Sequence, residues 1–234
     1  SNSGAPVGMI GYGRYAYYAA SDPNNGMELW RSDGTPGGTA LWLDLVPGPM
    51  AADPTHFVTA GNAMPGGHLF FTIWSAGGRR LARSDGTAIG TLGFGPVFAQ
   101  ITHMFGTAAG VFFLADAGQG LGIELYFSDG TWNGTRLVRD MNPGAGAALY
   151  YEMRPFGGGL LFACEDYSGT GLEPWYSDGT TAGTVRLGDL YPGSGHSQPR
   201  DFCALSPTLA VFTADSPATG NELYVTDGTP GGTR

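Results

Sequence analysis

The amino-acid sequence predicts an all-β protein, a five-bladed β-propeller whose blades are four-stranded antiparallel sheets. Three observations support this fold class. A Ser/Thr-Asp-Gly-Thr motif occurs five times at nearly even spacing, and an apolar run precedes each copy. The 41 glycines and 16 prolines interrupt the chain too often for a long helix.

The repeated motif has the composition of a tight turn. Its aspartates lie 52, 44, 49 and 49 residues apart, at Asp33, Asp85, Asp129, Asp178 and Asp227. A period of this size indicates one supersecondary unit repeated as a propeller or a solenoid. The aspartate accepts hydrogen bonds from nearby backbone N–H groups and the glycine supplies a positive φ, so each copy predicts a turn between two strands.

Each repeat divides into four strands. In the fourth repeat a first strand ends at a glycine turn (155–159), an apolar second strand follows (160–164), and a third (173–177) and a fourth strand (184–189) flank the turn motif. The second strand recurs at 15–19, 68–72, 111–115, 160–164 and 209–213. An unbroken apolar strand is typical of a sheet covered on both faces, and four-strand units of this length favour a propeller over a solenoid.

The predicted domain is one propeller over residues 5–234, built of five repeats of 44–52 residues, preceded by a tag remnant or flexible terminus at 1–4. The sequence ends where the fifth repeat's fourth strand should begin. Either the fifth blade closes with three strands, helped by N-terminal residues, or the sequence is a segment of a longer chain. We favour the second interpretation.

Composition excludes some partners. The net charge is −9 and all 11 basic residues are Arg, so no basic stripe for nucleic acid is expected. No apolar run approaches the roughly 20 residues of a membrane-spanning helix, and no span is predicted. Cys164 and Cys203 predict two buried free thiols, or one disulfide between adjacent repeats.

The first repeat carries a specific signature. Glu28-Leu29-Trp30, two residues and Asp33-Gly34-Thr35 form the run Glu-Leu-Trp-x-x-Asp-Gly-Thr. The chain resembles, over nearly its full length, the bacterial repeat family named for this run, and its strand order is similar to TolB-type propellers, whose first strands line the channel. The resemblance implies an extracellular or cell-surface bacterial protein, or a periplasmic one, often within larger multidomain chains. It implies no established activity.

The second repeat departs from this signature. Arg80-Leu81-Ala82 replaces Glu-Leu-aromatic, and Gly93-Phe94-Gly95-Pro96 replaces the strand that ends in Asp elsewhere. The second blade is therefore expected to be degenerate or specialised.

Most acidic residues recur at repeat positions, which predicts structural roles such as the capping of turns. The competing interpretation is Ca²⁺ held by carboxylates and loop carbonyls, although no EF-hand loop occurs. We therefore expect no metal site or cofactor, with Ca²⁺ as the alternative.

Irregular charged residues gather near the predicted first strands. If these strands line a channel, seven side chains converge at one mouth: Asp53, His56, His103, Glu152, Arg154, Arg200 and Asp201. Glu152, Asp201, His56 and His103 could then bind a metal or transfer protons, as in a propeller hydrolase or lyase. The simpler interpretation is a polar, water-filled channel. No nucleophile elbow or Cys–His pair is present, so the sequence favours a protein without catalytic activity.

Aromatic residues in loops suggest a different site. Exposed rings beside amides and charges can stack on sugar faces and bind hydroxyl groups. The candidate ligand-binding residues are Trp132, Asn133, Tyr150, Tyr151, Tyr191 and Arg154, with the tyrosines expected in inter-blade crossings. The predicted function is an extracellular or cell-surface lectin-like or adhesion module for a glycan or other surface ligand. The alternatives are the propeller hydrolase or lyase, and a structural spacer in a larger surface protein.

Overall fold

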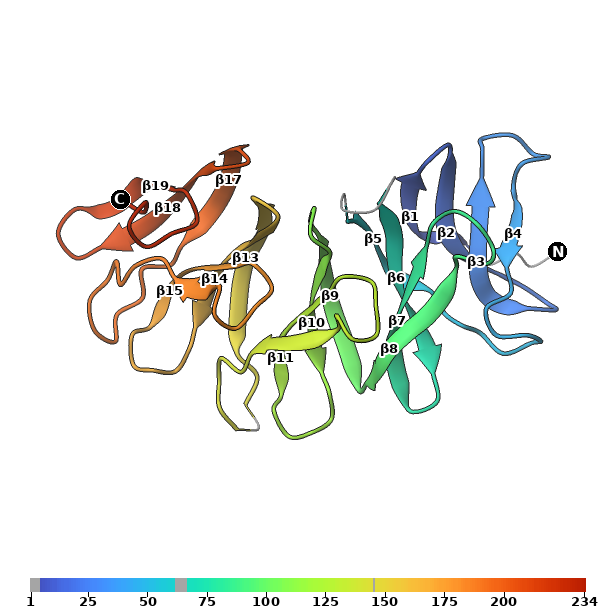
Figure 1. The fold of residues 1–234 in the computed structure, drawn as a ribbon, viewed down its shortest axis with the longest axis horizontal. Coiled ribbons are helices and arrows are strands. Elements are labelled where there is room, and N and C mark those ends of the chain that lie inside the picture. The colour runs from blue at the N-terminus through green and yellow to red at the C-terminus, as the bar shows by residue number, and fades with distance from the viewer. Residues whose placement is uncertain (1–4, 62–66, 145) are drawn as a thin grey trace.

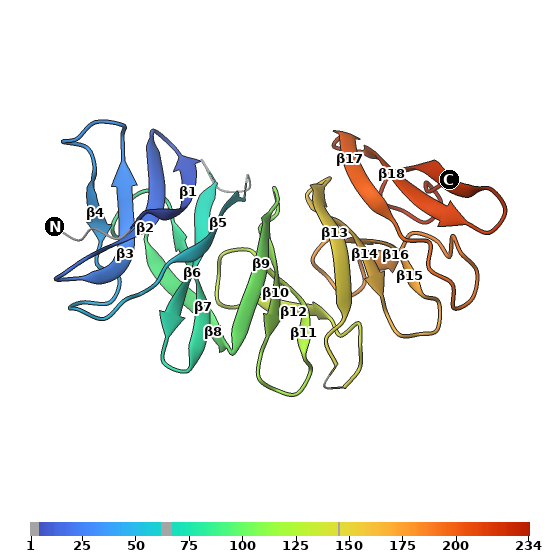
Figure 2. The same cartoon turned by 180° about the vertical axis from the view of Figure 1, so that it is seen from behind.

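The computed structural model describes residues 5–61, 67–144 and 146–234, and it contains five antiparallel sheets in sequence order along an arc (Figures 1 and 2). Within these ranges all regular structure is β-strand, which confirms the all-β prediction. No helix in the described part of the chain is long and apolar enough to cross a membrane. The prediction for residues 1–4 lies outside the described residues.

The first four sheets, which we call blades 1 to 4, each contain four strands. Blade 1 contains β1 (Val7–Tyr12), β2 (Tyr15–Asp22), β3 (Gly26–Ser32) and β4 (Ala40–Leu43). Blade 2 contains β5 (Thr55–Ala60), β6 (His68–Ser75), β7 (Gly78–Ser84) and β8 (Leu92–Phe98). Blade 3 contains β9 (Gln100–Gly106), β10 (Val111–Asp116), β11 (Ile123–Ser128) and β12 (Arg136–Arg139). Blade 4 contains β13 (Leu149–Phe156), β14 (Gly159–Glu165), β15 (Leu172–Ser177) and β16 (Thr184–Arg186).

Blade 5 has three strands, β17 (Arg200–Ser206), β18 (Leu209–Ser216) and β19 (Gly220–Thr226). Beyond β19, Arg234 and Val225 exchange both backbone hydrogen bonds, at 2.9 and 3.0 Å. Arg234 thus occupies the place where the fourth strand begins in the other blades, for example at Ala40, the partner of Arg31.

The arrangement is propeller-like, but the ring is not closed. The first strands of consecutive blades contact one another and line the concave side of the arc (Figure 1). Blades 1 and 5 lie at opposite ends of the arc (Figure 2). The predicted four-stranded antiparallel sheets in a propeller-like arrangement are thus confirmed, with three strands in the last sheet. A closed five-bladed propeller stays a prediction, because these five sheets form an open arc in which only consecutive sheets contact one another.

The core lies between consecutive blades and comes largely from the second strands. Phe71, Phe113, Phe162 and Phe212 occupy the same position of four blades and are completely buried. Burying each ring stabilises the fold by about 1.5–3 kcal/mol, so the packing of sheet on sheet is the main support of the arc. The apolar runs recognised in the sequence are confirmed as these strands.

The two cysteines are free, Cys164 buried and Cys203 exposed. The disulfide alternative is wrong for this structure, as is the expectation that both thiols are buried. Cys203 lies on the innermost strand of blade 5, whose side chains are mostly exposed.

Candidate functional site

The Asp-Gly-Thr turns stabilise themselves. In blade 4 the Asp178 Oδ1 atom accepts hydrogen bonds from the Thr180 N–H at 2.8 Å and the Thr180 hydroxyl at 2.7 Å. The Thr180 hydroxyl in turn accepts the Gly183 N–H at 2.9 Å. A Cβ atom at Gly183 would overlap the Asp178 carboxyl group, so this position requires glycine. The same network occurs in all five turns, and the turn carboxylates therefore serve the fold.

The repeated glutamate of the third strand binds the crossing, the segment that connects its blade to the next blade. Glu124 is completely buried. It accepts hydrogen bonds from the Met141 N–H at 3.0 Å, the Ala148 N–H at 3.3 Å and the Tyr150 hydroxyl at 2.9 Å. Burial raises the pKa of Glu124 above its ordinary value. Glu28 and Glu173 bind the equivalent crossings in blades 1 and 4.

Blade 2 lacks both this glutamate and the crossing that it would bind. Arg80 stands in place of the glutamate, and β8 ends at Phe98, two residues before β9 begins at Gln100. The glutamate's partners elsewhere lie 17 and 24 residues further along the chain, as for Glu28 with Leu45 and Ala52. The departure of blade 2 from the repeat is therefore a direct connection to blade 3, in place of a longer crossing bound by a glutamate.

The first strands carry an unusual backbone feature at the concave side. In four blades the first strand bulges at its beginning, and the bulge starts with a residue of positive φ. The four residues are Gly8 (67°), His56 (55°), Glu152 (49°) and Asp201 (59°). A positive φ costs a non-glycine residue about 1 kcal/mol or more, and strained residues and bulges concentrate at functional sites. The channel residues chosen from sequence thus include three of these positions.

The side chains at the bulges form two separate groups. Glu152 and Asp201 are exposed on the neighbouring first strands of blades 4 and 5. The Arg154 guanidinium lies 3.7 Å from Glu152, and Arg200 lies 3.8 Å from Asp215. Asp53 pairs with Arg79 in blade 2.

The two histidines belong to blades 2 and 3. His56 is half-buried and contacts the backbone of Thr102, the residue before His103. Its Nδ1 atom lies 3.1 Å from the Thr55 hydroxyl. Burial lowers the pKa of His56. His103 is exposed, and its Nδ1 atom lies 3.1 Å from the Thr102 hydroxyl.

The predicted aromatic residues have different environments. Trp132 is 60% exposed in the turn between β11 and β12, with Asn133 beside it. Tyr191 is half-buried, with its ring against the backbone of Gly195. Tyr150 and Tyr151 lie within β13, which corrects their expected place in an inter-blade crossing.

The side chains of Tyr150 and Tyr151 diverge. The Tyr150 hydroxyl donates to Glu124 and accepts the Leu125 N–H at 3.1 Å, and burial raises the pKa of this hydroxyl well above its ordinary value. Tyr150 is therefore a link between blades 3 and 4. Tyr151, at 49% exposure, presents its ring to the surface.

Tyr151 lines a groove of about 300 Å³ between blades 4 and 5. The groove is formed by Tyr151, Leu172, His196, Gln198, Pro199 and Arg200. The His196 Nδ1 atom accepts the Leu172 N–H at 2.9 Å, which leaves the proton of a neutral imidazole on Nε2. Gln198 has a φ of 45°, and its carbonyl accepts a hydrogen bond from Arg200 at 3.5 Å. The groove thus combines an aromatic face with amide, imidazole and guanidinium donors.

Sequence reasoning missed His196 and Gln198 as site residues. Both lie in the irregular crossing before β17, where no periodic pattern indicates which side chains are exposed. The only signal was Pro199, which predicts an extended or turn conformation for the residue before it.

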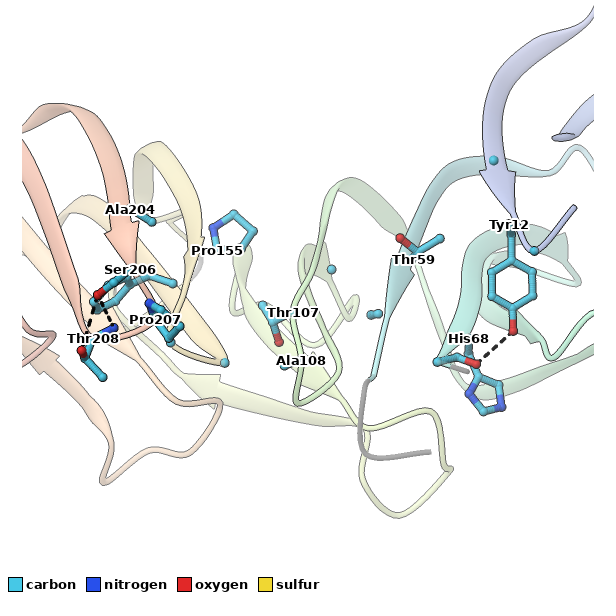
Figure 3. A pocket seen from close by; sticks show the side chains of 18 residues that line it. Tyr12, Thr59, His68, Thr107, Ala108, Pro155, Ala204, Ser206, Pro207 and Thr208 are labelled. Atoms are coloured by element: carbon cyan, nitrogen blue, oxygen red, sulfur yellow. Dashed lines mark hydrogen bonds between the residues drawn. The ribbon is translucent and has the colours of Figure 1, made fainter. Parts of the chain in front are cut away.

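A wider hollow of about 910 Å³ lies at the opposite end of the first strands, where each turns into the second strand. Figure 3 shows its labelled residues, with Tyr12 and His68 on one side and Ser206, Pro207 and Thr208 on the other. The Tyr12 hydroxyl donates to the Gly67 carbonyl at 3.0 Å. The lining is otherwise largely glycine, alanine, proline and small hydroxyl residues, and it contains none of the predicted site residues.

The described ranges contain no group of three His, Cys, Asp or Glu side chains placed to share a metal ion. The turn carboxylates, Glu28 and Glu124 accept hydrogen bonds from backbone or hydroxyl donors, whereas the Oε1 atom of Glu173 is buried without a hydrogen-bond partner in the described residues.

No protein-family model and no curated protein matches the chain. Among solved structures, a puromycin-hydrolyzing peptidase of Mycobacterium tuberculosis matches 95% of this chain at 13% identity, with a TM-score of 0.53, over 37% of its own length. A puromycin hydrolase matches 100% of the chain at 16% identity, with a TM-score of 0.35, over 53% of its length. An exo-β-1,3-galactanase of Phanerochaete chrysosporium matches 97% at 13% identity, with a TM-score of 0.36, over 61% of its length.

The chain thus spans between 37% and 61% of the length of these structures. At such low identity the peptidase shows the fold alone. Together with the sheet topology, it places the chain among propeller-like all-β proteins.

Proposed function

We propose that this chain is a ligand-binding module whose site is the groove between blades 4 and 5, and that its ligand is a glycan. The observation that carries this proposal is the exposed ring of Tyr151 in a groove with Gln198 and Arg200. A sugar presents an apolar C–H face and a rim of hydroxyl groups. A tyrosine ring can stack on the face while nearby donors bind the rim.

Backbone geometry supports a pre-organised site. Four of the six non-glycine residues of positive φ in the described chain belong to blades 4 and 5 or their connection: Glu152, Tyr167, Gln198 and Asp201. Residues held in such conformations are fixed by their surroundings, so less conformational entropy is lost when a ligand binds. Tyr167, at 47% exposure, offers a second ring in blade 4.

The resemblance in the repeats supports a cell-surface setting for the module. We propose an extracellular or surface-attached bacterial protein, with adhesion as its role and with the module carried in a larger chain. A structural spacer would have the same repeats but would bind no small ligand.

A glycan array followed by calorimetry tests the proposal. We expect a sugar hit whose affinity falls at least tenfold in Tyr151→Ala and is unchanged in Trp132→Ala. Trp132 is the matched control because its ring is also exposed, at 60% against 49% for Tyr151, but lies outside the groove. Absence of any sugar hit, or equal loss in both variants, would refute the groove as a glycan site.

A second candidate is a hydrolase or lyase acting at the concave side. It is supported by the positive φ of His56, Glu152 and Asp201 at equivalent bulges. Carboxylates and imidazoles could there exchange protons with a substrate. Activity that survives alanine at these three positions and at His103 would exclude this candidate.

A further inference from the structure

A second groove lies at the joint between blades 1 and 2. It has a volume of about 400 Å³ and is lined by Tyr12, Arg14, Tyr15, Tyr17, Asp85 and Thr87. The first four residues belong to β1, β2 and the turn between them, and the last two belong to the Asp-Gly-Thr turn of blade 2. Tyr17 forms one buried cluster with Leu69 and Phe71 of blade 2, and Tyr12 and Tyr15 pack against this cluster. Both walls of the groove are thus supplied by two blades that contact each other.

Tyr17 carries a hydroxyl group at a position that is apolar in the other blades. It pairs across the sheet with Arg31, three positions before the turn glycine Gly34. The residues with the same pairing in blades 2 to 5 are Phe70, Phe112, Leu161 and Val211. Tyr17 is only 1% exposed, so its ring fills the core as the other side chains do. Its hydroxyl group is the feature that the repeat does not explain.

This hydroxyl group faces the groove. The hydroxyl groups of the two neighbouring tyrosines are bound, that of Tyr12 to a backbone carbonyl at 3.0 Å and that of Tyr15 to Arg14 at 2.8 Å. The Tyr17 hydroxyl has no hydrogen-bond partner within the described residues, and it lies 3.7 Å from the Cβ position of Gly86 in the turn of blade 2. A hydroxyl group at such a buried position costs stability unless a polar partner binds it. The groove is the place from which a partner can reach it.

The two walls carry complementary polar groups. On the wall of blade 1, Arg14 is exposed and gives one of its five N–H groups to Tyr15. On the wall of blade 2, Asp85 is exposed, and hydrogen bonds from the hydroxyl and the N–H of Thr87 hold the pKa of its carboxyl group below the ordinary value. The groove therefore offers hydrogen-bond donors on one wall and an ionised acceptor on the other.

We propose that this groove is a second saccharide site, separate from the groove between blades 4 and 5; the inference rests on the proposed glycan-binding function. Sugar hydroxyl groups both donate and accept, so one neutral sugar can bind Arg14, Asp85 and the Tyr17 hydroxyl while its C–H face contacts a tyrosine ring. A purely anionic ligand would meet Asp85, and a purely cationic ligand would meet Arg14.

The two grooves should select different sugars. The groove between blades 4 and 5 presents imidazole, amide and guanidinium groups, whereas this groove presents phenol, carboxylate and guanidinium groups. Two sites at different joints would let one module hold two residues of a glycan-coated surface, which raises the overall affinity without any new contact.

Saturation-transfer difference NMR with methyl glycosides of glucose, galactose, mannose, fucose and N-acetylglucosamine tests the second site. The protein is the Tyr151→Ala variant, whose groove between blades 4 and 5 lacks its aromatic ring. We expect at least one glycoside to bind this variant, and the affinity to fall about three- to tenfold when Tyr17→Phe is added. The midpoint of urea unfolding should stay unchanged, because phenylalanine occupies this position in blades 2 and 3.

Tyr18→Phe is the matched control. It removes the same group from the next residue of β2, which lies on the opposite face of the sheet, and binding should be unchanged. Equal losses in Tyr17→Phe and Tyr18→Phe would overturn the second site, and binding of free amino acids but of no glycoside would overturn its ligand class.

The Tyr151→Ala background separates this proposal from the glycan site between blades 4 and 5. A glycoside that binds the unmodified protein but not Tyr151→Ala would overturn the second site alone. Binding that depends on Tyr17 and on no residue of the other groove would support the second site and refute the first. An unmodified protein that binds none of the glycosides would overturn the second site, and the glycan array then decides on the first.

Discussion

Replacing the buried glutamate of blade 3 should destabilise the protein strongly. Glu124→Ala removes the acceptor of the Met141 N–H and of the Tyr150 hydroxyl. It also removes one of two acceptors of the Ala148 N–H, which lies 3.3 Å from the Ile123 carbonyl as well. A buried donor left without a partner costs about 1–3 kcal/mol of stability. The variant no longer has to desolvate a carboxylate, which offsets part of this cost. We expect a net loss of about 3–5 kcal/mol in the free energy of unfolding, against a total of about 5–15 kcal/mol for a typical domain.

The chain contains a matched control for this experiment. Glu222 occupies the same repeat position in blade 5 but is exposed. Glu222→Ala should change the free energy of unfolding by less than about 0.5 kcal/mol, as surface substitutions usually do. Urea unfolding followed by tryptophan fluorescence measures both variants, and hydrogen exchange at the Met141 and Ala148 amides measures the local effect. Equal stability of the two variants, with unchanged exchange, would refute the fastening role of the repeated glutamate.

Three further predictions concern the turns, the histidine and the thiols. Gly38→Ala places a methyl group on the Asp33 carboxylate and should lower the free energy of unfolding in urea by about 1–3 kcal/mol. Gly37→Ala meets no described atom within 4 Å and should change this free energy by less than about 0.5 kcal/mol. Equal effects of the two variants would contradict the overlap at Gly38. Burial lowers the pKa of His56, so its contribution to stability is complete above the unfolded value of 6.5 and is lost as the pH falls through the folded value. The free energy of unfolding should therefore depend less on pH below about 6.5 in His56→Gln than in the unmodified protein, and parallel profiles would show that this histidine is not responsible. Thiol titration of the folded protein should modify exposed Cys203 and spare Cys164, whose pKa is raised by burial, and two fast-reacting thiols would contradict the packing of blade 4.

The sequence predicted the repeated parts of the structure well, because each is set by neighbouring residues. Asp178, Thr180 and Gly183 interact within six positions of one another, so their turn is visible in a linear motif. The apolar second strands were equally visible, since in blades 2 to 4 every residue of such a strand faces a neighbouring blade (Figure 1). Closure of the ring depends on the angle between consecutive blades, and no local sequence pattern determines that angle.

The candidate site was only partly predictable. Removing the repeat positions left His56, Glu152 and Asp201 as irregular residues, and the structure places all three at equivalent bulges. Tyr150 and Tyr151 looked alike in sequence, yet one hydroxyl is bound to a glutamate 26 residues away and the other ring is exposed. That difference arises from which face of β13 each side chain occupies, and a strand of mixed composition does not reveal it.

The direct connection in blade 2 indicates which changes of repeat length this architecture tolerates. A crossing that is deleted while its glutamate remains would leave a buried carboxylate without donors, and a crossing kept without its glutamate would leave backbone N–H groups unpaired. Blade 2 has neither the glutamate nor the crossing, and its turn aspartate lies 44 residues before the next one, against 49 or 52 elsewhere. The glutamate and the crossing are thus present together or absent together. Insertions between blades should therefore leave the fold intact wherever the two backbone N–H groups that bind the glutamate are preserved.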